Sequence, residues 1–199
     1  MRSFFLMLCL AFAVVHAEPV PPAAPAAADE WGLPQLMQNL AKVQSSHGKF
    51  VEKKYLSVLN KPLEASGTLL FQAPAHLEKH TLVPKAENLV LDQGVLTIEN
   101  SARNIKRTLV LQEYPAVWAF VESIRSTLAG DLPMLERFYT IRLEGSEAKW
   151  RMQLLPLEQR TREVVREIVI AGRGNRLTSI ETSESNGDHS TLTVVEETQ

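Results

Sequence analysis

Two histidines of this chain come closest to a metal-binding or catalytic spacing. His76 and His80 stand four residues apart, which on a helix would place both imidazoles on one face, as in helical zinc sites. Pro74 and Pro84 frame this segment, and its residue pattern predicts a strand instead. Residues four apart on a strand are roughly 13 Å apart, too far to share one ion. We therefore interpret both as surface histidines and expect neither a metal nor a cofactor.

Other catalytic patterns are missing from the sequence. It contains no G-x-S-x-G nucleophile elbow, and Gly172-Arg173-Gly174 is typical of a tight hairpin rather than a phosphate-binding loop. The acidic residues form no pair that stands out from a solvated sheet face. We therefore predict no catalytic residues and a protein that is not an enzyme. A hydrolase that uses His76 or His80 stays open as an alternative.

The first residues have the pattern of a secretory signal peptide. Arg2 precedes 12 apolar residues from Phe4 to Val15, and Ala17 ends a small-residue cleavage site. The apolar run is shorter than the roughly 18 residues of a transmembrane helix, so we expect no membrane anchor. Cys9, the one cysteine, lies inside this run and would be removed with it, which argues against lipidation there. We predict a signal peptide over 1–17, a Pro/Ala-rich linker over 18–29, one folded domain over 30–199, and a periplasmic location.

The charge balance excludes one large class of partner. With 21 basic and 23 acidic residues the net charge is −2, whereas a nucleic-acid-binding protein is expected to be basic. Arg103, Lys106 and Arg107 form one small basic cluster. It is interpreted as an exposed strand end, or else as a docking patch for an acidic protein surface or a lipid phosphate.

The remaining chain predicts a curved antiparallel sheet with short helices. Apolar spacing indicates helices after Leu33 and after Pro115, with a shorter helical segment over 132–136. Alternating segments separated by turn residues predict strands over 49–58, 67–72, 77–83, 88–92, 95–99, 105–112, 138–143, 149–155, 162–170, 176–184 and 188–195. In the segment 162–170 we expect Val164, Ile168 and Ile170 to share one face, interrupted by Arg166. Because so few helices cannot cover such a sheet from outside, we expect the sheet to wrap around their apolar faces.

Large apolar residues dominate the positions that face this common interior. They fill an ordinary packed core, or they line an adaptable cavity, for which methionine and aromatic side chains are well suited. The candidate ligand-binding residues are Leu36, Met37, Leu40, Val43, Phe50, Leu69, Phe71, Trp118, Val121, Leu128, Trp150 and Met152.

Four short motifs, in order along the chain, resemble the periplasmic lipoprotein carriers of the LolA type. The stretch 40–50 (LAKVQSSHGKF) resembles that family's first helix running into its first strand. The stretch 67–74 (GTLLFQAP) resembles its glycine, alternating strand and proline, and 89–94 (LVLDQG) the hairpin that follows. Leu154-Leu155-Pro156 resembles a Leu-x-Pro motif of the later half. The similarity extends over roughly residues 33–195.

The resemblance implies a fold and a function. The fold would be mainly β with α: an unclosed antiparallel half-barrel with a helical lid over an apolar cavity. The function would be the non-catalytic transfer of acylated lipoprotein or lipid cargo, by a monomer, from an inner-membrane exporter to an outer-membrane acceptor. A lipid-sensing regulatory or protein-interaction module of the same fold stays open as an alternative.

Three positions depart from the family pattern. Many carriers have an arginine just before the proline that is thought to gate the lid, and this chain has Ala73 there. The strand after the proline reads Leu77-Glu78-Lys79 instead of Phe-x-Trp, and Glu52 stands where glutamine is common. These departures predict a divergent member of the family.

Overall fold

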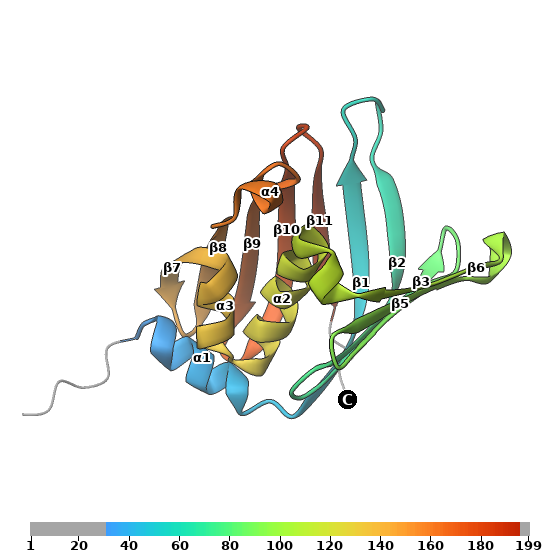
Figure 1. The fold of residues 1–199 in the computed structure, drawn as a ribbon. Helices are drawn as coiled ribbons and strands as arrows, with labels where there is room; N and C mark the ends of the chain where they lie inside the picture. Colours follow the sequence, from blue (N-terminus) through green and yellow to red (C-terminus); the bar gives the residue numbers. More distant parts are fainter. Residues whose placement is uncertain (1–30, 196–199) are drawn as a thin grey trace, which may run out of the picture.

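The computed structural model describes residues 31–195, in which one large sheet carries short helices on one of its faces (Figure 1). The predicted signal peptide and linker lie outside the described residues. The helices are α1 (Leu33–Ala41), α2 (Pro115–Ala129), α3 (Leu132–Phe138) and α4 (Gln159–Arg162). The strands are β1 (Ser45–Tyr55), β2 (Leu63–Gln72), β3 (His76–Val83), β4 (Glu87–Asp92), β5 (Val95–Asn100), β6 (Ile105–Val110), β7 (Tyr139–Ser146), β8 (Lys149–Pro156), β9 (Val165–Arg173), β10 (Arg176–Glu184) and β11 (His189–Val195).

The eleven strands form an open antiparallel sheet. Their order is β6-β5-β4-β3-β2-β1-β11-β10-β9-β8-β7, so chain neighbours pair throughout, except that β1 pairs with β11 to join the two halves. The end strands β6 and β7 do not pair with each other, and the sheet is therefore not closed. The predicted fold class, an unclosed half-barrel that is mainly β with α, is confirmed.

Proline and glycine set the ends of the two longer helices. Pro34 and Pro115 occupy the first turn of α1 and α2, where a missing N–H leaves no helical hydrogen bond unmade. Gly130 ends α2 with φ 65°, in the left-handed region that glycine adopts without steric cost. A Cβ at Gly130 would collide with the Met37 carbonyl oxygen and with Ala41, so this glycine also lets α1 cross close to the end of α2.

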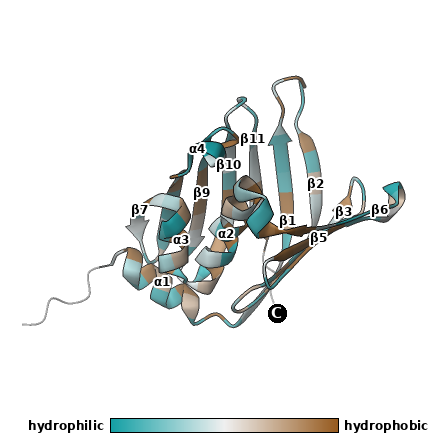
Figure 2. Ribbon diagram, in the orientation of Figure 1, coloured by the Kyte–Doolittle hydropathy of each residue, from teal (hydrophilic) through white to brown (hydrophobic). Residues whose placement is uncertain are grey.

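The packed core lies between the helices and the half of the sheet that runs from β1 through β11 to β7. Leu36, Met37 and Leu40 of α1 are fully buried there, as are Trp150, Met152 and Leu154 of β8. These β8 residues alternate with Arg151 and Gln153, as the sequence predicted. Figure 2 shows the hydrophobic colour concentrated along β9 under the helices and along β5 on the opposite side of the molecule.

Several strand starts differ from the sequence-based prediction, most of all those of β1, β2 and β9, and β2 begins at Leu63 rather than Gly67. The first strand begins at Ser45 rather than Lys49, directly after α1. The prediction that Val164 shares one face with Ile168 and Ile170 is wrong, because the strand begins at Val165 rather than at residue 162 and Val164 lies outside it. Val165 is buried while the Val164 side chain is 51% exposed. A register shift between Ser183 and Glu184 opposite this point allows Val165 to turn inward.

The close crossing of α1 over the end of α2 gives the first testable expectation. Gly130→Ala should lower the free energy of unfolding by about 2–4 kcal/mol, because the new Cβ is both strained and obstructed. The matched control is Gly174→Ala, since Gly174 also has a positive φ, 55°, but nothing lies within 4 Å of its Cβ position. The control should lose only about 1 kcal/mol in urea unfolding. Equal losses would mean that the contact between α1 and Gly130 contributes nothing.

Candidate binding cavity

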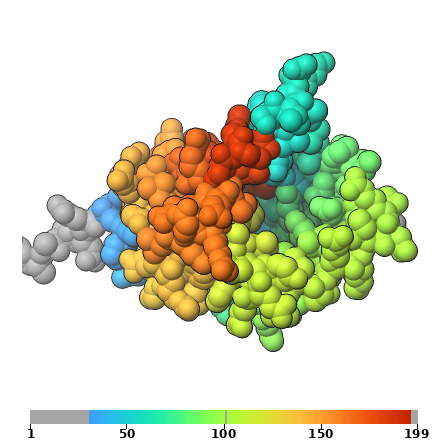
Figure 3. Space-filling model, turned by 45° about the horizontal axis from the view of Figure 1, so that its top comes forward, coloured from blue at the N-terminus to red at the C-terminus, as the bar shows by residue number. Residues whose placement is uncertain are grey.

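A cavity of about 1020 Å³ lies between α2 and the sheet, lined on the sheet side by residues of β1 to β5 and of β10 and β11. Its volume is at the upper end of the range of small-molecule sites in proteins. In the space-filling view, with the top of the molecule turned forward, a hollow is visible between the green strands, the cyan hairpin β1–β2 and the red hairpin β10–β11 (Figure 3).

Apolar residues of β2 to β5 form the wall of this cavity on the sheet side. The register pairs Phe71 with Leu77, Leu77 with Leu91, and Leu91 with Leu96, so that one inward row crosses four strands. Leu69, Lys79 and Leu89 form the next row. The lining leucines of this row and the next are Leu69, Leu77, Leu89, Leu91 and Leu96. No helix covers them fully, and all except Leu91 are only half-buried.

Helix α2 forms the opposite wall, and the burial of its apolar and polar side chains is unusual. Its apolar side chains line the cavity and are half-buried: Val117, Phe120, Val121, Ile124 and Leu128. Its polar side chains are the buried ones, including Glu122, Ser123, Ser126 and Thr127. A helix that packs on an ordinary core shows the reverse arrangement. The apolar face of α2 therefore borders the cavity between the helix and the sheet, and Phe120 and Ile124 on this face also pack against the core.

Arg125 organises the buried polar side of α2. Its Nε donates to Glu122 Oε2 at 2.7 Å, and its Nη2 donates to Ser126 Oγ at 2.9 Å and to Asp131 Oδ2 at 3.0 Å. Ser126 Oγ in turn donates to Glu122 Oε2 at 2.8 Å. Burial lowers the pKa of Arg125, but the hydrogen bonds with Asp131 and Glu122 outweigh this and raise it above its usual value. The guanidinium is thus a permanent buried cation.

The remaining Arg125 nitrogen connects α2 to the other half of the sheet. Nη1 donates at 3.0 Å to the carbonyl oxygen of Pro74, in the turn between β2 and β3. This is the proline that follows Ala73, the position at which the sequence lacks the arginine of the family pattern. In this chain the arginine belongs to α2, and the β2–β3 turn supplies the carbonyl acceptor.

The structure separates the twelve predicted ligand-binding residues into two equal groups. Six of them line the cavity: Leu40, Val43, Leu69, Phe71, Val121 and Leu128. The structure places five others, Leu36, Met37, Phe50, Trp150 and Met152, in the packed core and leaves almost none of their surface exposed. Trp118 packs edge-on against Phe138, with ring centroids 5.1 Å apart. These six are not among the residues that line the cavity.

Four charged residues that sequence reasoning did not select also line the cavity: Glu52, Glu78, Lys79 and Arg176. Lys79 of β3 and Glu52 of β1 point to the helix side of the sheet and form an ion pair of 2.5 Å. The Lys79 ammonium lies 4.9 Å from the centre of the Phe50 ring. The signal was present in the sequence, because Glu52 follows Gly48 and Phe50 at the period of two that defines one strand face.

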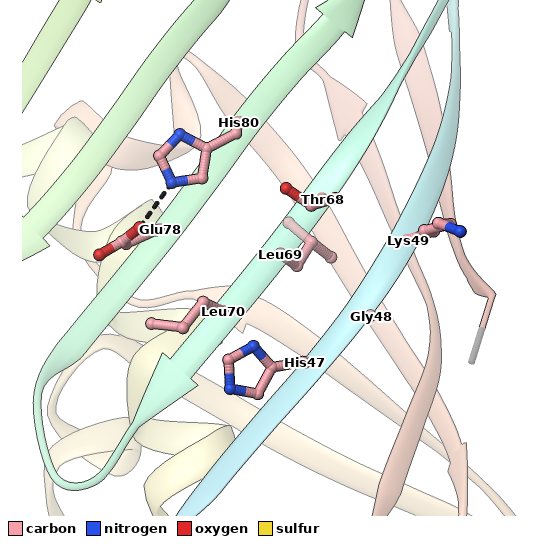
Figure 4. A pocket seen from close by; sticks show the side chains of 8 residues that line it. All are labelled: His47, Gly48, Lys49, Thr68, Leu69, Leu70, Glu78 and His80. Carbon is pink, nitrogen blue, oxygen red and sulfur yellow. Dashed lines mark hydrogen bonds and ion pairs between the residues drawn. The ribbon is translucent and has the colours of Figure 1, made fainter. Parts of the chain in front are cut away.

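The histidines that opened the sequence analysis lie on the other face of the sheet, away from the helices. His76, Glu78 and His80 share that face of β3, and both histidines contact the same carboxylate: His76 Nε2 lies 2.7 Å from Glu78 Oε1, and His80 Nε2 lies 2.5 Å from Oε2. Figure 4 shows Glu78 and His80 beside His47, in a small hollow of about 250 Å³ over β1 to β3. The pair is thus bridged by a side chain rather than independent in solvent.

This cluster perturbs two of its own groups. The pKa of Glu78 is lowered, first by the hydrogen bond with His80 and then by that with His76. The pKa of His80 is raised by the hydrogen bond with Asn88 and then by that with Glu78, although burial opposes the shift. Residues 31–195 contain no group of three or more His, Cys, Asp or Glu side chains that could hold a metal ion.

The basic residues near the edge strand β6 are largely solvated. Lys106 forms an exposed ion pair with Glu99, and Arg103 and Arg107 are exposed. Among the described helices, none is both long and apolar enough to cross a membrane.

An open antiparallel sheet, a helical cover and an apolar cavity between them define a carrier-type fold for apolar ligands. Residues 23–196 match the family described as outer membrane lipoprotein carrier protein LolA-like. The chain belongs to this family, as a divergent member.

Several solved structures are similar to the chain at low sequence identity. A LolA superfamily protein from Nitrosomonas europaea matches with 9% identity and a TM-score of 0.44, over 83% of this chain and 94% of that one. A structure of the Pseudomonas aeruginosa MucA/MucB complex matches with 14% identity and a TM-score of 0.47, over 82% of this chain and 56% of that one. The Clostridioides difficile CwlD amidase in complex with the GerS lipoprotein matches with 9% identity and a TM-score of 0.38, over 77% and 84%. Among curated proteins, none matches the sequence.

The His–Glu–His cluster should make stability depend on pH. His80 contributes stability below its ordinary pKa of 6.5, which is lost as pH rises through its raised value in the folded protein. Glu78 contributes above its ordinary pKa of 4.5, which is lost as pH falls through its lowered value. Between pH 4.5 and 6.5, the ordinary pKa values of the two groups, Glu78→Gln should therefore reduce the free energy of unfolding by about 0.5–1 kcal/mol. Above this range the reduction should be smaller.

Urea unfolding at several pH values measures this effect. The control is Glu64→Gln, which removes an exposed ion pair with Lys53 and involves no histidine. The loss caused by the control should not change as pH rises above 6.5, the ordinary pKa of His80, whereas the loss caused by Glu78→Gln should shrink there. A Glu78→Gln curve parallel to that of the unmodified protein would contradict the assignment.

The buried Arg125 network should be strongly coupled. Arg125→Met should destabilise the protein by about 3–5 kcal/mol, because the Glu122 carboxylate stays buried without its cation. Adding Glu122→Gln should restore much of this loss, since the uncompensated charge is then removed. If the two losses measured by urea unfolding simply add, the ion pair does not hold this side of α2.

Proposed function

We propose that this chain is a non-catalytic periplasmic carrier. The cavity binds the acyl chain of a lipoprotein or another acylated lipid and shields it from water between two membranes. An inner-membrane exporter would load the cargo and an outer-membrane acceptor would receive it, with the carrier acting as a monomer. Membership of the LolA-like family supports the carrier class.

The observation that carries this proposal is the orientation of α2. Five apolar side chains of this helix line a cavity of about 1020 Å³, while Glu122, Ser123 and Ser126 are buried on its other side. Burying polar groups is unfavourable unless each is hydrogen-bonded. Here Arg125 donates to Glu122 and Ser126, and Ser123 Oγ donates to the Phe120 carbonyl oxygen. The sequence thus buries the polar face of α2 and leaves its apolar face incompletely packed. This arrangement is expected where a bound ligand completes the interior.

The energetics of acyl transfer fit such a cavity. Transferring an acyl methylene out of water is worth about 0.8 kcal/mol, so a palmitoyl-length chain gains about 12 kcal/mol on burial. A carrier must offset most of this hydration cost and still release its cargo. A cavity walled by leucine, valine and phenylalanine side chains meets both needs, because it offers area without many directional contacts.

Access to the cavity would depend on the tie between α2 and the β2–β3 turn. Arg125 is held on its own helix by Glu122 and Ser126, and its bond to Pro74 reaches across to the other half of the sheet. Moving α2 away from β2 and β3 would break this single bond and leave the network on α2 intact. We infer that this contact lets α2 act as the lid.

A charge on the helical wall tests the proposal. Val121→Glu should reduce the affinity for an acyl probe at least tenfold, because an ionised carboxylate would face the ligand. Fluorescence titration with an acyl-chain fluorophore measures this, with circular dichroism to verify folding. The matched control is Val51→Glu on the outer face of β1, where Val51 is exposed; it should bind the probe like the unmodified protein.

Two results would overturn the carrier proposal. One is unchanged probe affinity in folded Val121→Glu. The other is an unmodified protein that binds no probe and, after purification from a periplasm, yields no acylated species in mass spectrometry of its organic extract. The second result would favour the protein-interaction module as the function of this fold.

A further inference from the structure

One sector of the cavity wall is charged, and it is built from three adjacent strands. Glu52 on β1 and Lys79 on β3 are separated by β2, yet their side chains meet. The register places Ala65 of β2 beside Glu52 and Leu69 beside Lys79, with Gly67 between them. Because Gly67 carries no side chain, the lysine and glutamate can meet across β2 above the Phe50 ring.

This ion pair is poorly explained as a stabilising contact. Both side chains are largely withdrawn from solvent, with exposed fractions of 26% for Lys79 and 22% for Glu52. Desolvating two charges consumes most of what their attraction supplies, so an apolar pair of similar size would stabilise the sheet equally well. An ammonium group also has three N–H donors, of which Glu52 Oε2 accepts one. Lys79 therefore has donor capacity left for a second acceptor in the cavity.

The polar sector lies at one end of the cavity. Thr182 of β10 and Ser190 of β11 line it as well, and Lys54 pairs with Glu184 one row further toward the hairpin ends of these strands. The hairpins themselves are joined by the Ser57 N–H, which donates to Asp188 Oδ1 at 2.8 Å. The opposite end, beneath α1 and the last turns of α2, is lined by Leu40, Val43 and Leu128, and also by Gln44, just before β1, and Arg176 at the start of β10.

We propose that the cavity selects an acyl amphiphile whose polar end is anionic, a carboxylate or a phosphate, with Lys79 as its counter-ion. The tail lies along the leucine row toward α1, and the head lies at Lys79, near the hairpins. Glu52 holds the Lys79 side chain in the cavity and competes with the ligand head for the ammonium group. This inference rests on the proposed carrier function and adds to it the charge and orientation of the ligand.

The test compares ligands that share one chain and differ in the head. Palmitate, palmitoyl lysophosphatidate and methyl palmitate are each used to displace an acyl fluorophore. Lys79→Met should weaken palmitate and lysophosphatidate about tenfold and leave methyl palmitate unchanged, because a charge-assisted hydrogen bond is lost. Glu52→Gln should have the opposite sign and tighten the anionic ligands, because it removes the competing carboxylate.

The control and the outcomes keep the two proposals separate. Lys53→Met removes a lysine from the outer face of β1, where it pairs with Glu64, and should alter none of the three affinities. A protein that binds no ligand at all contradicts the carrier function itself. A protein that binds all three equally, with Lys79→Met and Glu52→Gln without effect, keeps the carrier function and overturns the assignment of Lys79. Weakening by Lys79→Met of only one anionic ligand identifies whether carboxylate or phosphate is the preferred head.

Discussion

The hydrogen-bonded network around Arg125 determines which way α2 faces, and much of the molecule depends on that choice. Glu122, Ser126 and Asp131 satisfy the guanidinium on the side of the helix that faces α3 and the core. The opposite side then carries the apolar residues, which border the cavity between the helix and the sheet. A buried network of polar groups thus orients an apolar surface toward a cavity. The same guanidinium reaches Pro74 and connects this helix to the cavity's other wall.

Most of the fold could be predicted from the sequence, because strands with one buried face carry a strong period-two signal. The alternation of Trp150, Met152 and Leu154 with charged neighbours fixed both the strand and its inward face. The residue at which a strand begins was harder to predict. Val164 and Val165 have the same side chain, and only the register shift opposite them decides which one is buried.

The candidate site was half predicted, for a physical reason. Strand parity tells which face of the sheet a residue takes, but it does not tell which part of that face the helices will fill. Phe50 and Leu69 therefore appeared equivalent, although the first belongs to the core and the second to the cavity wall. Lys79 and Glu52 were missed because charged residues in a strand are usually solvated, and their meeting depends on Gly67 of the strand between them. The spacing of His76 and His80 also did not reveal that both contact one carboxylate, that of Glu78 between them on the same strand face.

The join between β1 and β11 divides the sheet into two halves with separate tasks. One half, from β11 to β7, is packed beneath the helices and supplies the core, whereas β2 to β5 mainly supply cavity wall. Substitutions in the wall change a surface that is already incompletely packed, so they remove little of the interior that holds the chain folded. In the proposed carrier function, substitutions in the leucine row and its neighbours would therefore change ligand preference while the folded scaffold persists. Such a separation of tasks makes this architecture readily evolvable, because a lineage can acquire a different cargo without first acquiring a different fold.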